Sequence, residues 1–336
     1  MAKRLCLFDT TKFILIFVVI FIHMFERVND LSYNNCFFSG IYLFAMPLFI
    51  FVSGFFSKRY EDKKSFLMSE FRLFESFVIL HLISILYKLL VEGCPIGIRD
   101  IINPGFSSWY LVSLIYFRAI LQFTPKGFLN SKWLMPACLA ISLLGGFVPV
   151  GLAFSIQRTF TFLPFFMLGY LVKERNWLEK IRIKPWVAAT ILVVVFVGMF
   201  VSISLIDKWG YQFHSVMTGL HVYSEISDFV IHPLLFRALF LILSTIAGCA
   251  VLSLVPTRHV PILTDNGKDS LLFYFYHSIV FRLALMLYPV LSLETNILNI
   301  VLGAVVVMAI LMLFNKIPFL HYIMNPVTRK LKPNTK

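Results

Sequence analysis

The sequence predicts an all-α integral membrane protein with about ten transmembrane helices and both termini in the cytoplasm. The first observation is composition: 59% of the 336 residues are hydrophobic, only 14% are charged, and the mean hydropathy is +0.84. These values are too apolar for a soluble domain. The second observation is a series of apolar segments about 20 residues long, the length that a membrane-spanning helix needs. The third is an asymmetry of positive charge between alternate connections.

The apolar segments are expected to be helices, because the bilayer core contains no water to satisfy backbone N–H and C=O groups. In chain order the windows are 8–26, 36–56, 71–91, 107–124, 133–151, 158–173, 186–206, 230–255, 269–290 and 295–315. No low-complexity segment and no convincing internal repeat interrupts the series. Residues 1–336 are therefore expected to form a single membrane domain.

Positive charge is distributed unevenly between the two sides of the membrane. With the N-terminus in the cytoplasm, most of the 30 Lys and Arg residues fall on the cytoplasmic side. The outer side receives only Arg27, Arg99, Arg158 and Lys208. This asymmetry is the positive-inside pattern of membrane proteins. The net charge of +13 is therefore explained by topology, and the sequence predicts the lipid bilayer as a partner, with no nucleic-acid partner.

The first window contains a polar stripe on an otherwise apolar helix. Its members are Asp9, Lys12, His23 and Glu26. Lys12 and His23 are eleven residues apart, about 20° past three full helical turns, so both lie on one face. Lys12 is expected at the cytoplasmic edge, and His23 about 16 Å farther along, in the outer half of the membrane. Asp9 has the spacing to pair with Lys12, and Glu26 has the spacing to pair with His23.

Further ionisable residues fall inside the windows, where burial is costly and a functional role is the usual reason. Those expected near the midplane or in the outer half are Arg118, Arg237, His232, His277 and Arg282. Cations that converge on an embedded histidine suit an anionic ligand or a developing oxyanion. They suit an ion or solute pathway equally well. The structural alternatives are hydrogen bonds between helices for the histidines and ion pairs for the arginines.

The longest outer connection, residues 207–229, is rich in aromatic side chains. They are Trp209, Tyr211, Phe213 and Tyr223. Aromatic rings pack against the C–H face of a sugar, so this segment is a candidate carbohydrate platform. An interfacial aromatic belt explains the same composition. The five cysteines lack the spacing of a metal site, and the sequence predicts no bound metal.

Five features in chain order carry a family resemblance. The first is the spacing of Lys12 and His23, which matches an (Arg or Lys)-x10-His motif on a first helix. The others are the segments FAMPLFIFVSGFF (44–56), SSWYLVSLIYFRAI (107–120), RTFTFLPFFMLGYL (158–171) and LLFYFYHSIV (271–280). Each segment alone is weakly specific, whereas the ordered set covers nearly the whole chain. Together they resemble the membrane-bound acyltransferase 3 family, particularly its fucose 4-O-acetylase-like branch.

Two positions depart from the pattern of that family. Its first motif position is more often Arg, and Lys12 keeps the charge but loses the bidentate fork. Its cytoplasmic Arg-x-x-Arg motif is incomplete, because Arg72 matches the second position while Ser69 replaces the first. No hydrolase-like domain follows the last window, unlike the fused members, so the chain is expected to act alone.

The resemblance implies a multi-pass O-acyltransferase of the cell membrane. Such an enzyme moves an acyl group, usually acetyl, from cytoplasmic acyl-CoA to a hydroxyl of a cell-surface or secreted glycan. Acetyl-CoA or another acyl-CoA is then the donor substrate, a glycan or lipid-linked sugar is the acceptor, and no cofactor is permanently bound. A polysaccharide exporter or another transporter is the alternative, because helices with embedded charges also suit transport.

The candidate site combines the polar stripe with the resemblance. His23 is expected to act as general base or to carry the acyl group covalently, with Lys12 and Glu26 as its catalytic partners. Residues expected to bind donor or acceptor are Asp9, Arg72, Trp109, Arg118, Arg158, His277 and Arg282. Arg72 is placed to meet CoA phosphates at the inner face. His277, about 12 Å into its helix, is better placed to guide the acyl arm than to act as the primary base.

Overall fold

The computed structural model describes residues 2–28, 36–105, 107–149, 153–205, 207–292 and 296–327. Within these ranges each predicted window contains one long helix. The long helices are α1 (Ala2–Val28), α2 (Cys36–Phe56), α3 (Lys63–Leu90), α5 (Trp109–Phe123), α7 (Leu134–Gly145), α8 (Ile156–Glu174), α10 (Pro185–Leu205), α13 (Ile231–Leu254), α15 (Ser270–Val290) and α16 (Ile297–Asn315). The short connecting helices are α4 (Ile98–Ile102), α6 (Lys126–Asn130), α9 (Leu178–Ile181), α11 (Asp207–Thr218), α12 (Tyr223–Ile226), α14 (Pro261–Gly267) and α17 (Pro318–Ile323).

Six helices in the described part of the chain are long and apolar enough to cross a membrane. They are α1, α3, α10, α13, α15 and α16. The chain is therefore a multi-pass membrane protein, as its composition predicts. Of the remaining windows, that of α2 contains a largely apolar helix of 21 residues, whereas those of α5, α7 and α8 contain helices that are shorter or less apolar. Ten spans with cytoplasmic termini therefore stay a prediction. Met1 and residues 328–336 lie outside the described residues.

Helices α1, α3 and α7 each have a boundary that differs by six residues or more from the window read off hydropathy. Helix α3 begins at Lys63, before the predicted window 71–91, because the Asp62 side chain caps two backbone N–H groups of its first turn. These hydrogen bonds lower the pKa of Asp62. Helix α7 ends at Gly145 rather than near 151, where a second glycine follows and glycine disfavours helix. Hydropathy detects the apolar part of a helix and misses polar turns that a cap supports.

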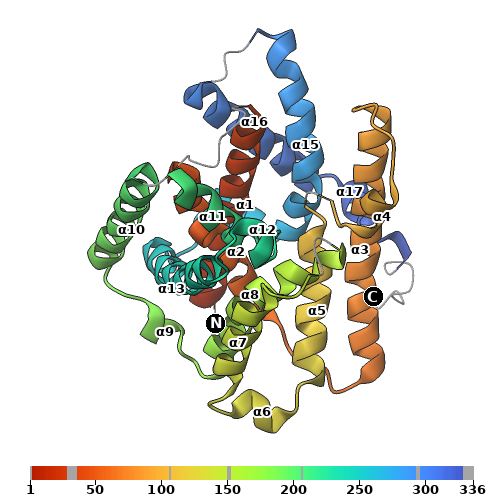
Figure 1. Ribbon diagram of the computed structural model, residues 1–336. Helices are drawn as coiled ribbons and strands as arrows, with labels where there is room; N and C mark the ends of the chain where they lie inside the picture. Colours follow the sequence, from red (N-terminus) through yellow and green to blue (C-terminus); the bar gives the residue numbers. More distant parts are fainter. Residues whose placement is uncertain are drawn as a thin grey trace.

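The helices form a bundle with α1 and α2 near its centre. Helices α10 and α13 lie on one side of this pair, and α3 and α5 lie on the other (Figure 1). Helices α15 and α16 also pack against α1. We call the end of the bundle where α1 begins and α2 ends the inner end, and the opposite end the outer end.

Helices α2 and α8 pack backbone against backbone. A Cβ atom on Gly54 would lie 1.9 Å from the carbonyl oxygen of Phe166, and one on Gly169 would lie 2.0 Å from that of Phe51. No side chain fits at either position. Small residues allow such close helix packing inside membranes, where association depends on van der Waals contact. The α2–α8 pair is therefore a rigid support for the residues that both helices present to the bundle interior.

The beginning of α1 is anchored by α14. A Cβ atom on Gly267 would lie 1.9 Å from the carbonyl oxygen of Asp9, so this contact is also with the backbone itself. The Oγ1 atoms of Thr10 and Thr264 lie 2.9 Å apart in a buried hydrogen bond. These contacts hold the inner end of the polar stripe in a defined position.

Candidate active site

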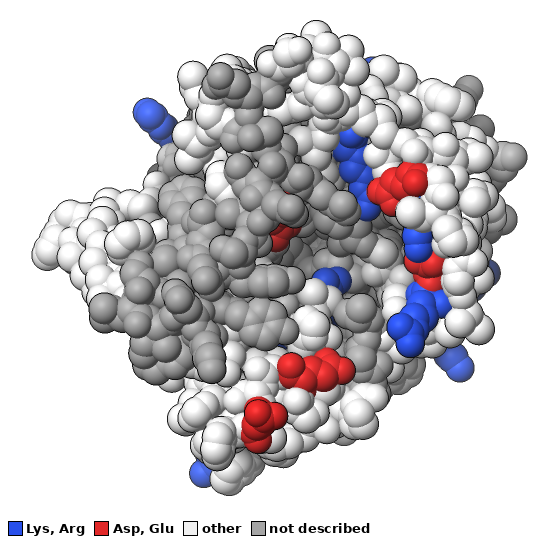
Figure 2. Space-filling model, turned by 45° about the horizontal axis from the view of Figure 1, so that its top comes forward, with Lys and Arg blue, Asp and Glu red and all other residues white. Residues whose placement is uncertain are grey.

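Two cavities lie toward opposite ends of α1. The outer cavity, of about 520 Å³, is lined by His23 and Glu26 together with residues of α3, α4, α8, α11 and α15. The inner cavity, of about 310 Å³, is lined by Lys12 together with residues of α2, α5 and α15. The outer face is hollowed, with Lys, Arg, Asp and Glu side chains along one side of the hollow (Figure 2). The polar stripe of α1 therefore reaches a different cavity at each of its ends.

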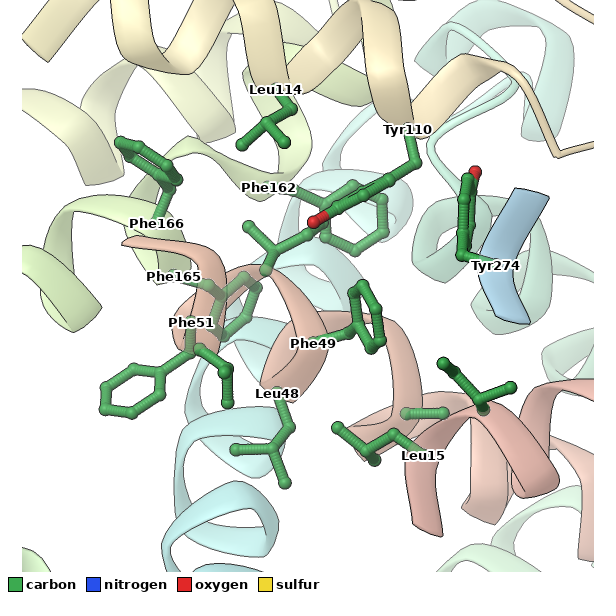
Figure 3. Packing of buried hydrophobic residues seen from close by; sticks show 14 of the residues in the cluster. Leu15, Leu48, Phe49, Phe51, Tyr110, Leu114, Phe162, Phe165, Phe166 and Tyr274 are labelled. Carbon is green, nitrogen blue, oxygen red and sulfur yellow. The ribbon is translucent and has the colours of Figure 1, made fainter. Parts of the chain in front are cut away.

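A wall of three aromatic rings separates the cavities. The ring of Tyr110 lies 5.2 Å from that of Phe49 and 4.9 Å from that of Tyr274, and the three side chains lie together in Figure 3. The Tyr110 hydroxyl and the Ser53 Oγ are 2.5 Å apart. Along α2, Met46 lines the outer cavity and Phe49 the inner one, so the wall is about one helical turn thick.

The structure contains both side-chain pairings expected along the polar stripe. The Lys12 Nζ lies 2.9 Å from an Asp9 carboxylate oxygen. The His23 Nδ1 lies 3.3 Å from the Glu26 Oε2. A carboxylate only accepts hydrogen bonds, so this contact places the proton of the neutral imidazole on Nδ1 and the lone pair on Nε2. His23 is therefore oriented as a general base with its reactive nitrogen directed away from Glu26.

Glu26 is itself held from a second helix. The hydroxyl of Tyr42, on α2, donates a hydrogen bond to the Glu26 Oε1. The Tyr42 ring packs edge-on against His214 of α11, with ring centroids 5.1 Å apart. Burial lowers the pKa of His214, and the charge of Glu26 opposes this effect. Sequence analysis missed Tyr42 and His214, because neither has a motif spacing and each reaches Glu26 only through helix packing.

His277 lies beside His23, from the opposite helix α15. The two rings stack with centroids 5.9 Å apart. The His277 Nδ1 is 2.5 Å from the carbonyl oxygen of Tyr274, and its buried Nε2 has no hydrogen-bond partner among the described residues. Phe281 stacks on His23 as well, at 5.8 Å. His277, which the sequence suggested as a guide for the acyl arm, is therefore in direct contact with His23.

Trp109 and Arg158 also line the outer cavity. The Arg158 guanidinium lies over the Trp109 ring, with its Cζ 4.6 Å from the ring centroid. Trp109 in turn stacks on Phe162, with centroids 5.6 Å apart. This arrangement gives the arginine a cation–π contact on one side and leaves its hydrogen-bonding edge for other partners.

Arg118, expected from the sequence near the midplane or in the outer half, lines the inner cavity, because α5 runs from the outer end inward. Its Nε lies 2.9 Å from Glu70 Oε1, and its Nη2 donates to Ser69 Oγ at 2.6 Å and to the Tyr60 hydroxyl at 3.2 Å. The serine that interrupts the Arg-x-x-Arg motif is thus a hydrogen-bond acceptor for an arginine from another helix.

Three other predicted positions lie apart from both cavities. Arg72 lines neither cavity. Arg237 is fully buried, donates a hydrogen bond to Thr161 Oγ1 and lies over the Tyr223 ring. His232 is exposed at the beginning of α13. Arg282 does line the outer cavity, with its Cζ 4.8 Å from the centroid of the Tyr87 ring.

The outer aromatic connection is not an exposed platform in its described part. Phe213 and Tyr223 are only 4% and 0% exposed, and the Tyr223 hydroxyl donates to the carbonyl oxygen of Leu143. The side chains of Trp209 and Tyr211 lie outside the described residues. Phe213 and Tyr223 therefore pack the outer end of the bundle rather than presenting their rings to a sugar.

A family model described as an acyltransferase domain, acyltransferase 3, matches residues 8–316. The match includes the whole polar stripe and every residue that lines the two cavities. No curated protein and no solved structure matches the chain significantly. The family match covers far more than half of the chain and agrees with the resemblance seen in its motifs. The chain therefore belongs to the acyltransferase 3 family and is a membrane acyltransferase.

Proposed function

We propose that this enzyme moves an acetyl or other acyl group from cytoplasmic acyl-CoA to a hydroxyl of a glycan or lipid-linked sugar outside the cell membrane. We further propose that residues 1–336 form one domain of ten membrane spans with both termini in the cytoplasm. The enzyme would need no permanently bound cofactor and would belong to the fucose 4-O-acetylase-like branch of its family. Its main support is the pair of cavities on α1, with Lys12 in the inner one and His23 in the outer one. A donor and an acceptor on opposite sides of a membrane need such an arrangement.

The inner cavity is suited to the donor. Lys12, Lys58 and Arg118 line it, and clustered cations favour the phosphates of an acyl-CoA. The thioester end of the donor must then cross the aromatic wall toward His23. Lys12 and His23 are about 16 Å apart along α1, so a long flexible arm that carries the acyl group is the form of donor that fits. Movement of Tyr110 and Tyr274 would open the passage.

The outer cavity supplies the groups for acyl transfer. The His23 Nε2 takes the proton of the acceptor hydroxyl while the hydroxyl oxygen attacks the thioester carbonyl carbon. Glu26, held by Tyr42, stabilises the resulting imidazolium through Nδ1–H. The cations that line the cavity stabilise the oxyanion of the tetrahedral intermediate. Collapse of this intermediate breaks the C–S bond, and the departing thiolate takes the proton, leaving an O-acyl ester and free CoA thiol.

A covalent route uses the same residues in two steps. The His23 Nε2 attacks the thioester first, releases CoA thiol and carries the acyl group as an acyl-imidazole. The acceptor hydroxyl then takes the acyl group and returns the imidazole to its starting form. His277, stacked on His23, has an unpartnered buried Nε2 and is the second nitrogen base within reach of the reacting atoms.

The test uses the purified full chain in proteoliposomes, with labelled acetyl-CoA supplied on one side and oligosaccharide acceptors on the other. We expect label in an ester on the acceptor and an equal amount of free CoA thiol. Omission of the acceptor separates the routes, because only the covalent route labels the protein. Folded protein that binds acetyl-CoA but transfers its acyl group to no hydroxyl acceptor would show that the proposed substrates are wrong.

A further inference from the structure

Arg158 is a cation in the outer cavity that pairs with no carboxylate among the described residues. It lies in the first turn of α8 and lines the cavity. Its Nε is buried and has no hydrogen-bond partner in the described part of the chain. Its guanidinium stacks on the Trp109 ring, and no ion pair is found for it among the described residues. An arginine that is held flat and unpaired in a cavity offers its hydrogen-bonding fork to an incoming anion.

Gln157 is a second unpartnered polar group at the same place. It precedes Arg158 on α8, is 1% exposed and lines the same cavity. Neither its Nε2 nor its Oε1 has a hydrogen-bond partner among the residues described. Buried amides are almost always hydrogen-bonded, because an unsatisfied one loses its interaction with water and gains nothing in return. A polar ligand that reaches Arg158 would also satisfy this amide.

Two carboxylates that line the cavity, Asp100 and Glu26, already have hydrogen-bond partners. At the rim of the cavity, the Lys88 Nζ lies 2.6 Å from an Asp100 carboxylate oxygen, and the hydrogen bond from Lys88 lowers the pKa of Asp100. Inside the cavity, Glu26 is bonded to His23 and Tyr42. The third described carboxylate that lines the cavity, Glu92, forms no ion pair with Arg158 either.

Arg158 is also close to the reacting groups. It lines the same cavity as Tyr42 and stacks on Trp109, which precedes the wall residue Tyr110 on α5. Tyr42 donates to the carboxylate that orients His23. A group bound to Arg158 consequently lies near both the histidine and the point at which an acyl group would arrive.

We propose that Arg158 and Gln157 form a subsite for an anionic group of the acceptor, within the same saccharide unit whose hydroxyl is acylated. This inference rests on the proposed function and adds the substrate class, an acidic sugar. A carboxylate, as in a uronic acid, and a phosphate, as in a sugar phosphate, share the oxygen geometry that a guanidinium fork recognises. Gln157 donates a further hydrogen bond to the anion.

The test compares acceptors that differ only at C6. Nitrophenyl glucosides and galactosides are offered as the neutral sugar, the uronic acid and the 6-phosphate, and kcat/KM for acetyl transfer is measured. We expect at least one anionic form to exceed the neutral form by about 10- to 100-fold, the range for a hydrogen bond to a charged group. The better anionic form then identifies the carboxylate or the phosphate as the source of the charge. Equal values for all three forms would overturn the inference.

Variants assign the preference to the subsite. Arg158→Gln should bring the ratio of acidic to neutral kcat/KM close to one, and Arg158→Lys should give an intermediate ratio because it keeps charge without the fork. Arg175→Gln is the matched control, because Arg175 directly follows the last residue of the same helix and its Cζ lies 4.9 Å from the centroid of the Trp177 ring. It lies outside both cavities. An unchanged ratio in a folded Arg158→Gln protein would contradict the assignment.

A binding measurement keeps the subsite separate from the reaction. The same glycosides are added without acetyl-CoA, and the thermal unfolding midpoint of the full chain in detergent is recorded. Wild-type protein should be stabilised more by the acidic form than by the neutral form, and Arg158→Gln should lose the difference. If no acceptor is acylated but this difference is present, the proposed function fails and the anion subsite stands. If acylation occurs without any acid preference in rate or binding, only the subsite fails.

Discussion

The His23 ring packs against both His277 and Phe281 of α15, and its Nδ1 is hydrogen-bonded to Glu26. Replacement by alanine removes the proposed base and leaves the cavity otherwise intact. General-base catalysis contributes about 10²–10⁴-fold, so His23→Ala should lose acyl transfer by that factor while still binding acyl-CoA. The loss for His277→Ala should be smaller, because the proposed reaction uses the lone pair of His23. Glycan acylation measured by mass spectrometry, beside donor binding, checks both expectations.

A matched control for these variants is His232→Ala. This histidine is exposed at the beginning of α13 and lines neither cavity, so its loss should leave transfer unchanged. Substantial acylation by a well-expressed His23→Ala protein would disprove the mechanism and make His23 a packing residue. A loss for His277→Ala equal to or larger than that for His23→Ala would exchange the two roles.

Lys12 is the residue that the structure places at the other end of the stripe, in the inner cavity and paired with Asp9. Lys12→Ala should raise the KM for acyl-CoA more than it lowers kcat, because the proposed role is donor engagement. Lys12→Arg should be tolerated, since the charge and the pairing are kept. Initial rates over a range of donor concentrations separate these effects. A variant with normal KM and reduced kcat would instead connect Lys12 to the chemical step.

At the scale of helices, the α2–α8 contact decides whether the aromatic wall and Arg158 keep their positions. Gly54→Ala puts a methyl group 1.9 Å from a backbone carbonyl oxygen, which cannot be relieved by a side-chain rotation. Overpacking typically costs about 1–3 kcal/mol, and the thermal unfolding midpoint in detergent should fall. Gly198→Ala is the control, because no atom lies within 4 Å of its Cβ position. Alanine also favours helix over glycine, so the midpoint of Gly198→Ala should be unchanged or higher.

Equal midpoints for Gly54→Ala and wild-type protein would show that the two helices can separate without loss of stability.

Helices α3 and α5 are joined by an ion pair rather than by close backbone packing. Arg118 and Glu70 are 18% and 12% exposed in their side chains, and each would leave a poorly solvated charge if the other were removed. This pair joins α5, which carries the wall residue Tyr110, to α3 beside the inner cavity.

At the scale of the whole molecule, the prediction is topology. Helices that alternate in direction, with Lys and Arg concentrated on one side, place the connection near Lys64 inside and the connection near Asp228 outside. Reporter fusions after these two residues should give cytoplasmic and external signals respectively. If both fusions gave the same signal, the two connections would lie on one side of the membrane. The proposed donor and acceptor sides could then not both be correct.

The sequence alone was sufficient for features that depend on local geometry. Apolar length predicts where helices lie, because a buried backbone in lipid must bond within its own segment. Helical periodicity places Lys12 and His23 on one face, and three-residue spacing predicts the Asp9–Lys12 and His23–Glu26 pairs that the structure contains. Ordered motifs likewise identified the family, which the match over residues 8–316 confirms.

Only the tertiary structure decided which helices face one another. Nothing local to Tyr42 or Gln157 indicates that they line the cavity of His23, and nothing local to His277 indicates that it stacks on His23. Likewise, nothing near Arg118 indicates that it pairs with Glu70. A helix that is apolar all round has no polar face to reveal its rotation, and contacts between helices depend on rotation, tilt and close approach at a few glycines. These quantities arise from packing many segments at once, which no single segment of the chain encodes.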